Sequence, residues 1–95
     1  MKHTFHIEVI SARTTHYCDE SLEEGVHLWG PIKVRDRLEV LVELKQPVPA
    51  DTLVPFIIRS LSACEIARVC LFDETIPFTR ESLQAVLSKQ SKRGE

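Results

Sequence analysis

The sequence predicts a single α+β domain in which two helices lie on one face of a three- to four-stranded, mainly antiparallel sheet. Apolar and polar residues alternate in residues 4–9 and 38–45, as they do in half-buried strands. In residues 52–63 and 79–90, apolar residues recur at the spacing of one helix face, and helix-capping residues stand at the start. The chain has 95 residues, of which 43% are hydrophobic and 27% charged, and this is enough for one modest core.

The two alternating segments are the clearest strands. In the first, Phe5, Ile7 and Val9 point to one face, and the polar residues between them point to the other. The second, residues 38–45, follows a shorter alternating stretch that begins at residue 32. The sequence RDR, residues 35–37, is interpreted either as the tight turn of a hairpin or as a bend within one long strand.

Residues 15–25, THYCDESLEEG, are polar and open to two interpretations. Ser21 and Glu24 have the spacing of a capping box, which predicts a short helix that ends near Gly25. The competing interpretation begins a strand at Val26. With the helix, the order of elements is that of a ferredoxin-like βαββαβ fold followed by a C-terminal helix.

The C-terminal half is predicted to contain a helix, a strand and a second helix. Pro55 fits only the first turn of a helix, so the first helix is expected to begin between residues 52 and 55. In residues 65–72 apolar side chains occur at both odd and even positions, so both faces of a strand here would be apolar. This favours a strand that is covered on both faces, or on one face by a partner chain, over a continued helix. Thr79 is the expected N-cap of the last helix. The domain is predicted to span residues 1–91, and residues 92–95 to form a disordered basic tail.

The composition disfavours several classes of protein. The net charge is −2, and the predicted strands carry no exposed aromatic side chains, so binding to nucleic acid is not expected. No stretch is long and apolar enough for a membrane span, and the N-terminus does not read as a signal peptide. Three cysteines form no disulfide framework, and their odd number indicates a reducing compartment, the cytoplasm.

The residues that could carry catalysis or bind metal are scattered. His16 and Cys18 are close in sequence, but Cys64 and Cys70 are distant and lack the close pairing of structural zinc ligands. Acidic neighbours disfavour a reactive thiolate at Cys18. We therefore expect no metal or cofactor, and a non-enzymatic function is favoured. A small-ligand-binding or enzymatic domain that uses His16, Cys18 and His27 is the alternative hypothesis.

The favoured function is that of a protein-binding module: an adaptor, a regulator or an inhibitor. Trp29, in HLWGP, is suited to be an apolar anchor, and His27 lies beside it. The neighbouring segment is rich in carboxylates that would steer a basic partner, namely Asp19, Glu20, Glu23 and Glu24. The small size of the chain and the apolar segment 65–72 also suit a homodimer.

Overall fold

The computed structural model describes residues 3–23 and 25–93, with the backbone alone for residues 90–93. It contains a six-stranded sheet, two α-helices and one short 3₁₀ turn. In chain order these are β1 (His3–Ala12), β2 (Cys18–Leu22), β3 (Val26–Val34), β4 (Arg37–Leu44), α1 (Ala50–Ser60), the 3₁₀ turn (Ser62–Cys64), β5 (Ile66–Leu71), β6 (Glu74–Pro77) and α2 (Arg80–Arg93).

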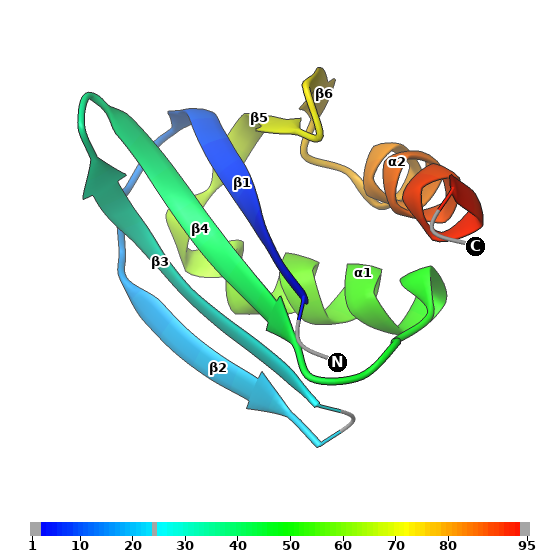
Figure 1. Cartoon of the computed structure of the whole chain (residues 1–95). Coiled ribbons are helices and arrows are strands. Elements are labelled where there is room, and N and C mark those ends of the chain that lie inside the picture. Colours follow the sequence, from blue (N-terminus) through cyan, green and yellow to red (C-terminus); the bar gives the residue numbers. More distant parts are fainter. Residues whose placement is uncertain (1–2, 24, 94–95) are drawn as a thin grey trace.

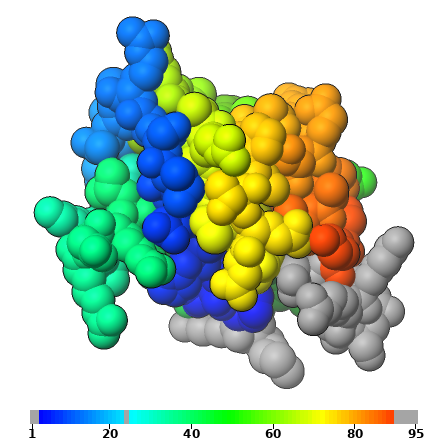
Figure 2. Space-filling model, turned by 90° about the horizontal axis from the view of Figure 1, so that it is seen from above, coloured from blue at the N-terminus to red at the C-terminus, as the bar shows by residue number. Residues whose placement is uncertain are grey.

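The strands lie in the order β2-β3-β4-β1-β5-β6, and every neighbouring pair is antiparallel. Both helices lie on the same side of the sheet (Figure 1). Seen from above, β1 lies between the β3–β4 hairpin and the β5–β6 hairpin, and α2 lies beyond β6 (Figure 2). The α+β class is thus correct, but the expected three- to four-stranded sheet is wrong, and the order of elements is not the ferredoxin-like βαββαβ.

The first correction concerns residues 18–22, which form β2 rather than a helix. Ser21, the expected N-cap, lies in β2, and Glu24 lies outside the described residues. After β2 the Gly25 amide donates a hydrogen bond to the Leu22 carbonyl over 3.0 Å. Gly25 has a φ of 98°, which suits glycine and reverses the chain into β3. Pairing with β3, whose start at Val26 is confirmed, outweighs the local helix signal.

The second correction is β6, a strand that the sequence analysis did not predict. The chain turns from β5 into β6 through Phe72 and Asp73, which both have positive φ, as in a type I′ hairpin turn. β5 is therefore an inner strand between β1 and β6, and its helix-free face is not covered by other elements. The expectation that both faces of this strand are covered within the chain is therefore wrong.

The helices agree with expectation in place but not in every detail. α1 begins at Ala50, before the expected residues 52–55, and Pro55 lies inside the helix with its side chain exposed. The start of α2 is confirmed, because the Thr79 hydroxyl accepts a hydrogen bond from the Ser82 amide over 3.2 Å. α2 continues to Arg93, and residues 94 and 95 of the predicted tail lie outside the described residues.

The core lies between the sheet and the two helices. One face of the sheet, here called the inner face, supplies the buried side chains of Phe5, Ile7, Val9, Val26, Leu28, Val40, Val42, Val69 and Leu71. The helices supply Leu53, Val54, Phe56, Ile57, Leu83, Val86 and Leu87. The opposite, outer face carries no covering element within the described chain. None of the described helices is long and apolar enough to span a membrane.

Candidate functional site

The outer face of the sheet is the surface that brings chemically distinctive side chains together. Residues that face one another on paired strands lie on the same side of a sheet. The register pairs Asp19 with Trp29, Trp29 with Leu41, and Leu41 with His6. These four residues therefore form one row across β2, β3, β4 and β1, with an indole and a leucine between a carboxylate and an imidazole.

His27 lies one step along β3 from this row and connects two of its members. Its imidazole is stacked on the indole of Trp29, with ring centroids 4.6 Å apart and planes 29° from parallel. Its Nε2 atom lies 2.7 Å from Oδ1 of Asp19 on β2. The His27 ring is 34% exposed and the Asp19 side chain 54%, so the trio is ordered yet open to solvent.

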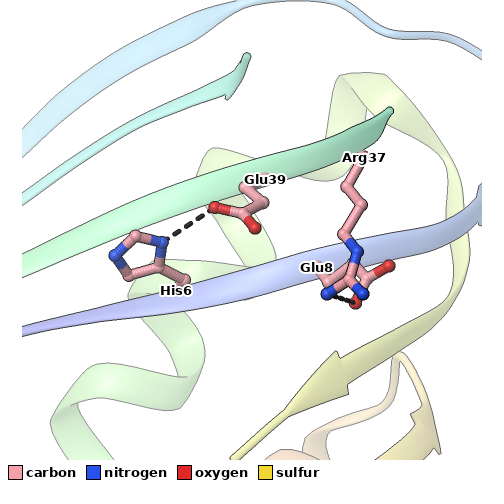
Figure 3. A network of polar contacts seen from close by, with 4 residues as sticks. All are labelled: His6, Glu8, Arg37 and Glu39. Carbon is pink, nitrogen blue, oxygen red and sulfur yellow. Dashed lines mark hydrogen bonds and ion pairs between the residues drawn. The ribbon is translucent and has the colours of Figure 1, made fainter. Parts of the chain in front are cut away.

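A second histidine–carboxylate pair lies at the other end of the row (Figure 3). Nδ1 of His6, on β1, lies 2.8 Å from Oε1 of Glu39, on β4. Next to it, Arg37 of β4 reaches over to Glu8 of β1, with 3.7 Å between the guanidinium nitrogen and the carboxylate oxygen. Glu39 is only 15% exposed although it lies on the open face, because its neighbours cover it.

The charges of the outer face are unequal. Strand alternation places four carboxylates on this face, on Glu8, Asp19, Glu39 and Glu43. The guanidinium groups of Arg37 and Arg68 are the cations on the same face among the described strand residues. With neutral histidines the face is therefore negative, and an aromatic stack lies within it. Such a surface attracts cationic groups.

Two surface hollows lie among the described residues, and both are open to solvent rather than enclosed. The hollow on the outer face is open and lies over β1 beside His6, Glu39 and Cys70. A second open hollow lies between the two helices, beside Pro55 and Arg80. Small-molecule sites usually bury most of the ligand surface, which neither hollow does.

The structure brings together three of the six predicted partner-binding residues. Trp29, His27 and Asp19 form the trio on the outer face. Glu20 lies next to Asp19 on β2, but strand alternation directs it to the other side of the sheet, where it is exposed. Glu23 is exposed in the turn after β2, and Glu24 lies outside the described residues.

The residues of the alternative hypothesis are not brought together. Cys18 is half-buried against the core on the inner side of β2, whereas the ring of His27 lies on the outer face. His16 contributes its backbone carbonyl, which accepts a hydrogen bond from the Cys64 thiol over 3.0 Å. Burial, with smaller contributions from Cys64, Glu20 and Asp19, raises the pKa of the Cys18 thiol to about 11. A thiol with this pKa is protonated at neutral pH and is a poor nucleophile.

β1 and β4 add residues to the surface that are not predicted from the sequence. Leu41 is an apolar residue at a polar position of the alternating segment 38–45, and it lies opposite both Trp29 and His6. Glu39 and His6 are 33 positions apart in sequence, so no local pattern could pair them. From the sequence, His6 is one of the polar residues that alternate with Phe5, Ile7 and Val9 and so face away from the core.

Neither a metal site nor a relative identifies the function. Within residues 3–23 and 25–93, no group of three or more His, Cys, Asp or Glu side chains is arranged to hold a metal ion. Comparison of the chain with protein-family models, with curated proteins and with solved structures gives no match.

Proposed function

We propose that the chain is a protein-binding module, an adaptor, regulator or inhibitor, whose outer face binds a basic surface of another protein. The observation that carries this proposal is the stack of His27 on Trp29 beside Asp19, on the side of the sheet that no helix covers. Tryptophan is among the residues that contribute most to binding at protein interfaces. A carboxylate at its edge supports recognition of a lysine or arginine.

The fixed geometry of the outer face supports the same proposal. Asp19 and Glu39 are each hydrogen-bonded to a histidine from a neighbouring strand, so both carboxylates are held in place before a partner arrives. Groups that are already ordered lose less conformational entropy on binding. The negative charge of the face would raise the association rate with a basic partner and make that rate sensitive to salt.

The proposed setting is the cytoplasm. Cys18, Cys64 and Cys70 are all free thiols, and thiols remain reduced in that compartment. A basic protein is the favoured partner over nucleic acid, because phosphate groups would meet the carboxylates of Asp19 and Glu39 on this face.

Quantitative affinity capture from a cell extract tests the proposal. The wild-type chain, W29A and D19K serve as baits, together with D51K, a matched charge reversal on the first turn of α1, away from the outer face. We expect basic proteins to be retained by the wild type and D51K and lost by W29A and D19K. Thermal melts establish that all four baits are folded at the capture temperature.

Three results would contradict the proposal. The first is retention of the same proteins by the wild type, W29A and D19K alike, because binding would then not depend on the outer face. The second is the absence of any protein that the wild type and D51K retain in common. The third is retention of proteins with acidic contact surfaces, which contradicts the charge argument.

A further inference from the structure

The two edges of the sheet differ in how they are protected. β6 forms one edge and β2 the other. β6 has only four residues, and it ends in Pro77, which has no amide hydrogen to donate. It is also tied to α2, because Nζ of Lys89 lies 2.8 Å from Oε2 of Glu74. These features are typical of an edge that is protected against pairing.

β2 has a regular, accessible edge. One side of its backbone is paired with β3 along residues 18–22, and its Leu22 carbonyl accepts a hydrogen bond from the Gly25 amide. On its other side, no described strand pairs with β2. In an antiparallel ladder an edge strand directs every second pair of N–H and C=O groups away from its neighbour. β2 contains no proline, and such an edge can accept an added strand.

The side chains of β2 define what an added strand should contain. Cys18 and Leu22 are half-buried against the core on the inner side, where α1 contacts β2. Glu20 lies between them, and Asp19 lies on the outer side. A strand beside β2 would therefore place apolar residues next to Cys18 and Leu22, and cationic residues next to Glu20 and Asp19.

The same side chains disfavour a second copy of this chain. If two β2 strands paired about their centre in antiparallel fashion, Glu20 would face Glu20 of the other copy. Like charges directly opposite one another destabilise a pair of strands. A basic segment would instead receive a favourable contact at this position. The charge on β2 thus selects a foreign basic strand over self-association.

We propose that β2 is a docking edge, at which an extended, lysine- or arginine-rich segment of the partner adds a seventh, antiparallel strand to the sheet. The inference rests on the proposed protein-binding function and identifies the segment of the partner that docks. Asp19 belongs both to the edge strand β2 and to the outer face, where it is paired with Trp29 on β3. It therefore links the docked strand to the outer-face contact. An added strand continues the row that runs from Asp19 through Trp29 to His6.

The test uses the capped peptide Thr-Val-Thr-Arg-Lys-Val-Thr, in which arginine and lysine face Glu20 and Asp19, and the valines face Leu22 and Cys18. Trp29 is the single tryptophan of the chain, so its fluorescence reports binding. Two further peptides carry N-methyl groups on one or the other set of alternate residues. They have the same side chains and charge, but each lacks the amide hydrogens of one edge.

Strand addition predicts that one N-methylated peptide binds like the parent and the other at least tenfold more weakly, since only one edge of the peptide faces β2. E20K should weaken binding of the parent at least tenfold, whereas D51K should leave it unchanged. Equal binding of all three peptides would overturn strand addition and leave a contact based on charge. Failure of the parent peptide to bind would also overturn it. The outer-face variants in the capture experiment decide the proposed function separately.

Discussion

His27 is stacked on Trp29 with 4.6 Å between ring centroids, and the same imidazole lies 2.7 Å from the carboxylate of Asp19 on the neighbouring strand. One histidine thus orders both an apolar anchor and an acidic group on the uncovered face of the sheet. A double-mutant cycle of H27A and W29A measures this relationship. We expect a coupling of about 0.5–1.5 kcal/mol in the free energy of unfolding, typical of aromatic pairs. Strictly additive effects would mean that the rings do not stack in solution.

The two faces of the sheet should respond differently to the same substitution. Leu28 is fully buried on the inner face, whereas Leu41 is half-buried on the outer face opposite Trp29. L28A should lower the free energy of unfolding by about 2–5 kcal/mol, the usual cost of a leucine truncated in a core. L41A should lower the free energy of unfolding by distinctly less than L28A does. Urea unfolding of the two variants and the wild type measures both losses. If L41A were as destabilising as L28A, the outer face would be covered rather than open.

Gly30 is required by the bulge that interrupts the pairing of β3 with β4. It has a φ of 130°, and a Cβ atom there would lie 2.8 Å from the Glu39 carbonyl oxygen. We expect G30A to lower the free energy of unfolding by about 2 kcal/mol or more, because strain in φ and a clash with backbone combine. G25A is the matched control: its φ is 98°, but its nearest contact, at 3.2 Å, is the flexible side chain of Gln46. Equal losses for the two variants would refute the close approach at Gly30.

Cys18 should react slowly with iodoacetamide at neutral pH. Burial is the main reason that the pKa of its thiol is raised from 9.0 to about 11, so little thiolate is present near pH 7. Peptide mapping by mass spectrometry after timed alkylation should show that the rate of Cys18 alkylation rises as the pH approaches 11. Rapid labelling of Cys18 at pH 7, compared with the urea-unfolded chain, would contradict the buried environment.

The same shift has a consequence for stability. In the unfolded chain the thiol ionises near 9, and in the folded chain near 11, so the folded state binds the proton more tightly between these values. The stability that Cys18 contributes is therefore present below pH 9 and is lost as the pH rises from 9 to 11. C18S removes this contribution, so its unfolding free energy should decline less over that interval than that of the wild type.

The sequence predicts those elements whose local pattern agrees with their tertiary surroundings. β1 and β4 alternate because one face of each is buried, and α2 begins at Thr79, whose side chain caps it. The local sequence of β2 does not distinguish a strand from a short helix. Ser21 and Glu24 have capping-box spacing whether or not a helix forms, and the strand depends on pairing with β3. β6 was missed because its hairpin turn uses Phe72 and Asp73 in place of the usual glycine-containing pair.

From the sequence, only those residues of the candidate site that are close together in the chain could be predicted. Trp29, His27 and Asp19 lie within one hairpin, so a local prediction could name all three. Glu20 was assigned to the same cluster, but the two-residue repeat of a strand directs it to the other face. His6 and Glu39 come from β1 and β4, and only the strand order places them in the same surface as Trp29.

The central claim is that the outer face, with β2 at its edge, binds a basic protein surface. The most direct measurement is a map of backbone amide shifts in the ¹⁵N-labelled chain as a basic protein retained by the wild type and D51K is added. The account predicts that the largest changes lie on β2, β3 and β4, around Asp19 and Trp29, and weaken as salt is raised. Changes centred on α1 and α2, or binding that does not respond to salt, would contradict it.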